Sequence, residues 1–373
     1  MLIGVPKEIK KLEHRVGLVP SSVKEFTTRG HEVLIETGAG AAINFGDKDY
    51  QEAGAKIAKS AEEVFKKADM IIKVKEPQPN ECKMLREDQV LFTYLHLAAD
   101  PQQAKDLMKS GCIAIAYETV IGRSGRGLPL LEPMSEIAGR LSVIVGATNL
   151  QKHHGGTGRL ISGVPGVRPA NVLVIGGGVA GFHAAQMATG LGANVTILER
   201  SNERMRYLDD YFHGRANIIY SNVDTLEKAA MKADLIIGAV LIPGASAPKL
   251  ISKAMLKNLI PGAVLVDIAI DQGGCFETSR PTTHDQPTYV VDNIVHYCVA
   301  NMPGAVPLTS ALALNHSVLP YALELADKGW RQAIQEIPGF RPGLNICKGE
   351  VTHEAVAESL NLPYNGTPKA LAA

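Results

Sequence analysis

Cysteine, aromatic residues and net charge are all scarce in this chain of 373 residues. The five cysteines are an odd number with no CxxC spacing, which argues against a disulfide framework and against a zinc site. The 38 basic and 38 acidic residues balance to a formal net charge of zero, which argues against nucleic acid or another polyanion as partner. We therefore predict neither a metal site nor a nucleic-acid surface.

Long apolar runs are missing as well. Residues 1–15 have no apolar region ahead of their charges and do not resemble a secretory signal. Polar residues interrupt the longest apolar stretches well before they could span a membrane. We therefore expect an enzyme or binding protein of the cytoplasm, with reduced thiols and no membrane segment.

Short apolar stretches alternate with helical ones along most of the chain. A first series occupies residues 1–133, where Ser21 or Ser22 is expected to cap a helix that Gly30 closes. A second series follows a long apolar helix over 134–152 and a loop rich in turn residues. This alternation predicts an α/β fold with two Rossmann-like, doubly wound parallel-sheet domains that flank a cleft and are linked by long helices.

A second long apolar helix follows Val306, and Pro320 is expected to kink or divide it. Long helices that enter and leave the second sheet indicate that the chain returns to the first domain. We therefore assign residues 1–133 and 306–373 to a discontinuous substrate and catalytic domain. Residues 134–305 are assigned to a Rossmann domain, and a GxGxxG motif at residues 176–181 indicates that it is the NAD-binding one.

The segment NVLVIGGGVAG carries the strongest motif, a GxGxxG between an apolar strand and a helix. In this motif Gly176 permits a tight turn, Gly178 lets the backbone approach a pyrophosphate, and Gly181 lets the helix pack on the strand. Glu199 ends the next strand about 20 residues on, where a carboxylate binds ribose hydroxyls and repels a 2′-phosphate. NAD is therefore favoured over NADP, although nearby arginines such as Arg204 weaken that preference.

Polar residues just beyond apolar runs are the candidates for binding a substrate, because ligands of doubly wound sheets bind at the carboxyl ends of strands. Five residues have this placement: Arg15, Lys75, His96, Asp271 and Asn301. Each taken alone is more often a surface or structural residue. Together, a guanidinium for a carboxylate, an ammonium for a carbonyl and an imidazole for protons suit a small α-keto or α-amino acid.

The segment VLVDIAIDQGGC places two acids four residues apart at the end of an apolar run. A buried carboxylate is costly unless it is paired or used, so the two acids need separate explanations. We assign Asp271 to the substrate cleft and Asp267 to a structural role. Gly273 and Gly274 would let the backbone pass close to a ligand.

Several segments resemble a known family. GVPKEIKKLEHRVGLVP and GVPGVRPANVLVIGGGVAG resemble two signatures of alanine dehydrogenases and of the N-terminal part of proton-translocating nicotinamide nucleotide transhydrogenases. KVKEP, TYLHLA, EPMSEIAGR, VDIAIDQGGC and NMPGAVP resemble alanine dehydrogenase segments in the same order. The resemblance implies reversible, NAD-dependent oxidative deamination of L-alanine to pyruvate and ammonium by a homo-oligomer, commonly a hexamer.

The resemblance also implies roles for individual residues. Arg15 and Lys75 would bind the substrate, His96 would be the acid and base, and Asp271 would be a second catalytic group. The cofactor-binding residues that we predict from the motif and the resemblance together are Ser135, Gly176, Gly178, Val179, Ala180, Gly181, Glu199, Arg204 and Asn301. Glu199 stands where relatives carry Asp, which keeps the charge and lengthens the reach.

Two alternatives stay open. The chain could be the NAD(H)-binding subunit of a transhydrogenase, whose counterpart carries an Arg-Gln-containing loop before the linker helix and lacks the Lys and His pair. Here the loop reads GLPLLEPMSEIAGR and both Lys75 and His96 are present, which favours the dehydrogenase. An opine- or saccharopine-forming dehydrogenase would need a larger cleft and a second carboxylate anchor, which we do not identify.

Overall fold

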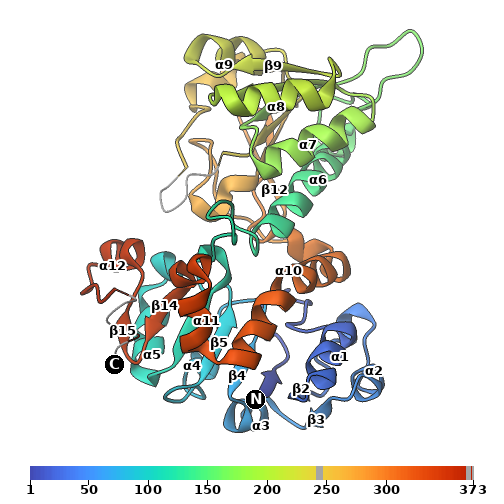
Figure 1. Ribbon diagram of the computed structural model, residues 1–373. Helices are drawn as coiled ribbons and strands as arrows, with labels where there is room; N and C mark the ends of the chain where they lie inside the picture. The colour runs from blue at the N-terminus through green and yellow to red at the C-terminus, as the bar shows by residue number, and fades with distance from the viewer. Residues whose placement is uncertain (241–246, 367–370, 372–373) are drawn as a thin grey trace. The chain divides into compact units, whose positions relative to one another are not determined.

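The computed structural model describes residues 1–240, 247–366 and 371. The chain divides into two compact units, Met1–Met134 with Val306–Ala373 and Ser135–Ala305. Each unit is built on one sheet with helices packed against it (Figure 1). The predicted α/β class is confirmed, but both sheets are mixed, with antiparallel strands at one edge.

The first unit holds an eight-stranded sheet in the order β15-β14-β6-β5-β4-β1-β2-β3. Its strands are β1 Leu2–Val5, β2 Glu32–Glu36, β3 Lys56–Ala58, β4 Met70–Ile72, β5 Val90–Thr93, β6 Ile113–Ala116, β14 Leu344–Cys347 and β15 Glu350–Val351. The six strands from β6 to β3 are parallel and follow the strand order of dinucleotide-binding sheets, which reverses between β1 and β4. The C-terminal strands β14 and β15 extend the sheet antiparallel beyond β6.

The helices of the first unit correct two predictions. They are α1 Pro20–Thr28, α2 Asp47–Glu52, α3 Ala61–Lys67, α4 Pro79–Cys82, α5 Pro101–Ser110, α10 Pro307–Lys328, α11 Trp330–Glu336 and α12 Glu354–Leu360. Ser21 and Ser22 lie inside α1, because Pro20 occupies its first turn and Val19 is the cap. Of the two effects predicted for Pro320, division is excluded, because α10 continues to Lys328 with buried residues on both sides of the proline, while the kink stays a prediction.

The second unit holds a seven-stranded sheet in the order β12-β13-β11-β10-β7-β8-β9. Its strands are β7 Asn171–Ile175, β8 Asn194–Glu199, β9 Ala216–Tyr220, β10 Leu235–Gly238, β11 Val264–Asp267, β12 Thr288–Val291 and β13 Ile294–Tyr297. Six are parallel in the same doubly wound order, and β12 pairs antiparallel with β13. Asp292 and Asn293 join these two with φ of 49° and 62°, as a two-residue hairpin requires, and this hairpin was not expected from the sequence.

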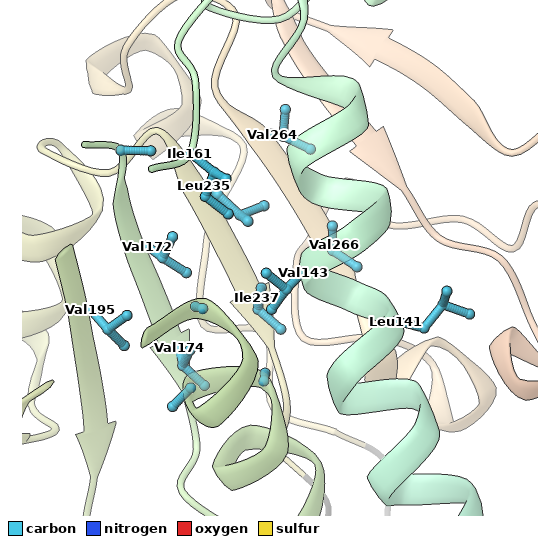
Figure 2. Packing of buried hydrophobic residues seen from close by; sticks show 14 of the residues in the cluster. Leu141, Val143, Ile161, Val172, Val174, Val195, Leu235, Ile237, Val264 and Val266 are labelled. Carbon is cyan, nitrogen blue, oxygen red and sulfur yellow. The ribbon is translucent and has the colours of Figure 1, made fainter. Parts of the chain in front are cut away.

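Helix α6, Glu132–Asn149, packs on one face of the second sheet. Figure 2 shows Val143 of this helix beside Ile237 and Val266 of the sheet, and all three are fully buried. A Cβ on Gly146 would lie 2.6 Å from Leu235, so the missing side chain lets the helix approach the strands. The other helices of this unit are α7 Val179–Gly190, α8 Asn202–Phe212 and α9 Val223–Ala230. In the part of the chain that the structure describes, no helix has the length and apolar character needed to cross a bilayer.

Candidate functional site

Three predicted site residues follow three neighbouring strands of the first sheet. Arg15 lies in the loop after β1, Lys75 follows β4, and His96 follows β5. Because β1, β4 and β5 are parallel neighbours, their carboxyl ends share one edge of the sheet. The strand order reverses between β1 and β4, and ligands of such sheets bind at this point.

The Arg15 guanidinium is almost entirely buried and is held by Glu13. Its Nε and Nη2 donate to the two Glu13 carboxylate oxygens at 2.7 and 2.6 Å, which is a bidentate ion pair. Its Nη1 lies 3.1 Å from the sulfur of Met134. Burial acts to lower the pKa of Arg15, but the Glu13 carboxylate outweighs it and the pKa is raised, so the guanidinium stays charged. Glu13 was not identified from the sequence.

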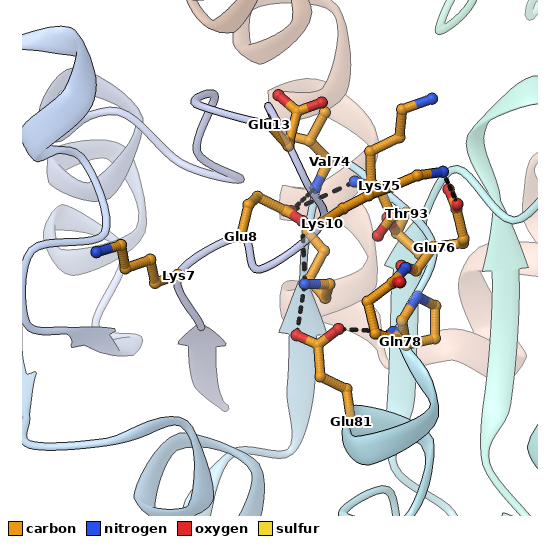
Figure 3. Close-up of polar contacts among 12 residues, drawn as sticks. Lys7, Glu8, Lys10, Glu13, Val74, Lys75, Glu76, Gln78, Glu81 and Thr93 are labelled. Atoms are coloured by element: carbon orange, nitrogen blue, oxygen red, sulfur yellow. Dashed lines mark hydrogen bonds and ion pairs between the residues drawn. The ribbon is translucent and has the colours of Figure 1, made fainter. Parts of the chain in front are cut away.

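Lys75 follows a buried cluster of charged residues that Figure 3 shows beneath it. Lys73 is 1% exposed and pairs with Glu8 at 3.1 Å and with Glu81 at 2.7 Å. Glu8 also accepts hydrogen bonds from the amides of Val74 and Lys75. The half-buried Lys75 side chain extends away from the Glu8 carboxylate (Figure 3). The sequence offered one unused signal for this cluster, a lysine inside the apolar run MIIKV.

His96 is exposed and has a left-handed backbone, with φ of 51°. Non-glycine residues rarely adopt this conformation, and such strain persists only where the surroundings enforce it. Glu118 does so by accepting the His96 amide at 2.6 Å, and the ring stacks on that of Tyr94 with centroids 5.8 Å apart. Burial raises the pKa of Tyr94 and Arg15 opposes that shift, so the stacked phenol stays neutral. The imidazole is thus presented to solvent from a firmly held turn.

The two acids of VLVDIAIDQGGC have different surroundings in the second unit. Strand β11 ends at Asp267, and residues Ile268–Gln272 form a 3-10 helix rather than the extended run that the apolar pattern indicated. Asp267 is fully buried and accepts hydrogen bonds from Ala269 N, Cys275 N, Phe276 N and Ser279 Oγ. Burial raises its pKa against the pull of these bonds. Asp271 is exposed. The hydrogen bonds of Asp267 fix the turn on which Asp271 lies.

The glycine motif forms the turn between β7 and α7 in the second unit. Gly176 has φ of 96°, and a Cβ on Gly181 would lie 1.8 Å from the Gly176 oxygen, so neither position accommodates a side chain. Gly178 caps α7 without any side-chain hydrogen bond, and a Cβ there would meet nothing within 4 Å. The start of α7 therefore has no side-chain cap, and a pyrophosphate could accept hydrogen bonds from its first N–H groups. These residues fit the diphosphate of NAD.

Glu199 lies directly beside this turn. Its carboxylate accepts the amides of Gly177 at 2.8 Å, Arg200 at 2.6 Å and Ser201 at 2.9 Å. A carboxylate has about four lone-pair positions, so it retains capacity for a ribose hydroxyl. The Nε of Arg204 donates to the Gly177 oxygen, and its guanidinium lies 4.5 Å from the centroid of the Tyr207 ring. These contacts explain the position of the Arg204 side chain without a 2′-phosphate as its partner.

The other predicted cofactor residues lie at three places in the second unit. Val179 and Ala180 form the first turn of α7, and Ser135 is half-buried in the first turn of α6. Asn301 has φ of 64° and precedes the 3-10 helix Met302–Ala305, and its carbonyl lies 3.2 Å from Nε2 of His284. The cofactor roles of these residues stay predictions.

No cluster of three or more His, Cys, Asp or Glu side chains that could hold a metal ion occurs among residues 1–240, 247–366 and 371. The five cysteines are buried thiols without a disulfide. Burial raises the pKa of Cys82 and Cys275 to about 12 and that of Cys112 to about 11. Thiols with such values carry little thiolate near neutral pH and are inert as nucleophiles.

The open space at Gly178 leads to a first prediction. Gly178→Ala is expected to leave the thermal midpoint unchanged, because the added Cβ meets no protein atom, but to raise the NADH dissociation constant about tenfold by obstructing the diphosphate. The matched control is Gly190→Ala at the other end of α7, where a Cβ also meets nothing within 4 Å. Calorimetric titration with NADH measures both variants. Equal affinities in the two would contradict a diphosphate site at this turn.

Comparisons with known proteins complete these observations. Residues 4–138 match the family model described as "Alanine dehydrogenase/PNT, N-terminal domain", and residues 142–354 match its C-terminal counterpart. An alanine dehydrogenase of Halomonas elongata is 54% identical, with 98% of each chain covered. A solved L-alanine dehydrogenase is 50% identical with a TM-score of 0.93, covering 97% of this chain and 99% of its own. A transhydrogenase from Sinorhizobium meliloti covers 94% of this chain and 100% of its own with a TM-score of 0.81, but at 22% identity it shows the fold alone.

Proposed function

This chain belongs to the alanine dehydrogenase/PNT family, and from that premise we propose that it catalyses the reversible, NAD-dependent oxidative deamination of L-alanine to pyruvate and ammonium. The observation that carries the proposal is the placement of Arg15, Lys75 and His96 after three adjacent parallel strands. A guanidinium, an ammonium and an imidazole at one sheet edge match the carboxylate, the carbonyl oxygen and the mobile protons of a small α-keto acid.

Substrate binding is assigned to the two cations. The Arg15 guanidinium, oriented by Glu13, holds the carboxylate of alanine or pyruvate, and the Lys75 ammonium polarises the oxygen on the α-carbon. Holding both ends of so small a molecule restricts its rotation and presents the α-carbon in one orientation. NAD, when bound, supplies the hydride-transfer chemistry at that carbon.

Proton transfer is assigned to His96. The exposed imidazole removes a proton from the water that adds at the α-carbon and returns it to the departing amine, and in reductive amination it acts in reverse. Glu118 fixes the backbone of His96 by accepting its amide, and the Tyr94 ring stacks on the imidazole. Asp271, presented by the turn that Asp267 fixes, is proposed as the second group that assists these transfers.

The cofactor is proposed to be NAD, held by the glycine turn, with Glu199 on the ribose. Glu199 supports NAD over NADP because a carboxylate at this position would repel a 2′-phosphate. Arg204 does not reverse that preference, since it is engaged with the Gly177 carbonyl and the Tyr207 ring. We further propose a homo-hexamer located in the cytoplasm, on the resemblance to relatives.

A transhydrogenase subunit is the second candidate, favoured by the shared fold of the Sinorhizobium meliloti protein. Such a subunit binds NAD(H) without a small substrate, so it has no use for a carboxylate clamp and an exposed imidazole at one sheet edge. The presence of both Lys75 and His96 therefore supports the dehydrogenase.

The deciding experiment follows absorbance in the NADH band with purified protein, pyruvate and ammonium. We expect NADH loss that depends on both substrates, because amination needs the carbonyl and the amine together. One control omits ammonium, and another replaces pyruvate with 2-oxoglutarate and lysine to test a saccharopine-forming activity. NADH binding without turnover in every mixture would overturn the proposal and favour the transhydrogenase subunit.

A further inference from the structure

We propose that Glu8 is a positioning residue for Lys75: from the loop after β1 it fixes the backbone at the end of β4 and so sets where the Lys75 ammonium meets the substrate. The inference rests on the proposed role of Lys75 in substrate binding. Glu8 itself is 7% exposed and its carboxylate is bound to groups of the protein, so it acts through Lys75 rather than on the substrate.

The segment that follows β4 is hydrogen-bonded to the sheet on one side only. Strand β1 pairs with β4 only at Met70 and Ile71, and it leaves the sheet after Val5. On the other side, β5 continues to hold the chain: Tyr94 N donates to the Val74 oxygen at 3.3 Å, and Thr93 Oγ1 donates to the Lys75 oxygen at 3.0 Å. Beyond Ile71, therefore, the β1 side of this segment lacks a strand partner.

Glu8 supplies the hydrogen-bond acceptor on this side of the segment. A single oxygen, Oε1, accepts the amides of Val74 at 2.7 Å and Lys75 at 3.3 Å. Successive amides of an extended strand point to opposite sides, so one acceptor for both marks the turn at which the chain leaves the sheet. Hydrogen bonds to a carboxylate are about twice as strong as neutral ones, which makes Glu8 an effective clamp for this turn.

Lys73 in turn orients Glu8. Its ammonium lies 3.1 Å from Glu8 Oε2, which leaves Oε1 directed at the two amides. Glu81 takes the other side of the ammonium at 2.7 Å and uses its second oxygen to accept the Gln78 amide. Glu8 and Glu81 are thus chemically alike neighbours of Lys73, but only Glu8 contacts the backbone of Lys75.

This difference provides a matched pair of variants, Glu8→Gln and Glu81→Gln. Each keeps the shape of the side chain and removes one of the two negative charges around Lys73, so both should lower the thermal midpoint by a similar amount. Only Glu8→Gln weakens the hold on Lys75, and we expect it to raise the pyruvate KM about fivefold while the NADH KM stays within about twofold. Glu81→Gln should leave both KM values near those of the wild type.

A double variant tests whether the effect passes through Lys75. In a Lys75→Ala background, adding Glu8→Gln should change pyruvate affinity for the NADH complex by less than about twofold, because the group that it positions is absent. Glu8→Ala removes the acceptor altogether and should raise the pyruvate KM more than Glu8→Gln does. If Glu8→Ala does not fold, the comparison of Glu8→Gln with Glu81→Gln tests the proposal by itself.

Three outcomes would overturn the proposal: an unchanged pyruvate KM in Glu8→Gln, an equal rise in Glu81→Gln, or a full additional loss in the Lys75→Ala background. A failure of the proposed function has a different signature. In that case the wild type itself shows no ammonium-dependent NADH loss with pyruvate, or Lys75→Ala leaves pyruvate affinity unchanged.

Discussion

The His96→Ala variant is expected to bind NADH as the wild type does and to lose about 100- to 10,000-fold in kcat. The imidazole is the one titratable side chain that we assign to proton transfer at the edge formed by β1, β4 and β5, so its removal takes the main acid and base from that step. The exposed position of His96 predicts little change in stability. Steady-state rates with pyruvate and ammonium, together with calorimetric titration with NADH, measure the two quantities separately.

The left-handed backbone of His96 calls for two controls. His96→Asn places a residue that tolerates this conformation at φ of 51°, so it removes the imidazole without adding backbone strain. His213→Ala changes another exposed histidine with positive φ, 47°, at the end of α8. His96→Asn should be as inactive as His96→Ala, and His213→Ala fully active. Turnover above a tenth of the wild-type rate in His96→Asn would contradict the assigned role.

The Arg15→Met variant is expected to lose both stability and substrate binding. It leaves the Glu13 carboxylate buried without its partner, which costs about 3–5 kcal/mol of unfolding free energy. It also removes the group assigned to the substrate carboxylate, so the pyruvate KM should rise about 10- to 100-fold. This factor corresponds to the free energy that hydrogen bonds to a charged group contribute to binding. Urea unfolding and pyruvate saturation curves measure the two effects.

A second substitution separates these effects. In Arg15→Met/Glu13→Met both charges are absent, and replacing a buried ion pair by apolar side chains is often neutral for stability. The double variant should therefore regain most of the lost unfolding free energy while the pyruvate KM stays high. A double variant that recovers a normal pyruvate KM would show that Arg15 serves the fold and not the substrate.

The motifs that the sequence revealed are those whose physical requirement is local. The GxGxxG turn is one: Gly176 needs a positive φ and Gly181 needs contact with the turn five residues before it, so the spacing, together with the flanking strand and helix, predicted the turn between β7 and α7. The alternation of strands and helices likewise predicted two α/β sheets. Their antiparallel edges escaped prediction, since the arms of the β12-β13 hairpin were not distinguished and the strands β14 and β15 are short.

The contact of Glu8 with Lys73 could not be predicted, because the two residues are distant in sequence. Glu8 and Lys73 are 65 positions apart, and nothing in the spacing of either indicates that they pair. The sequence also could not show where β11 ends, since Ile268 and Ile270 suit a buried strand as well as a 3-10 helix. The hydrogen bonds of Asp267 to a segment eight to twelve residues later decide that point.

The sequence by itself determined the α/β class, the glycine turn, the family and a short set of polar residues at strand ends, because each depends on local periodicity or on a contiguous motif. Only the tertiary structure decided which of those residues are held, and by what. Burying a charge is costly unless an opposite charge or hydrogen-bond donors meet it, and that partner is chosen by the packing of the whole sheet. Glu13 beside Arg15 and Glu8 beside Lys73 are partners of this kind, while Glu8 and Glu118 also accept the backbone amides of Lys75 and His96.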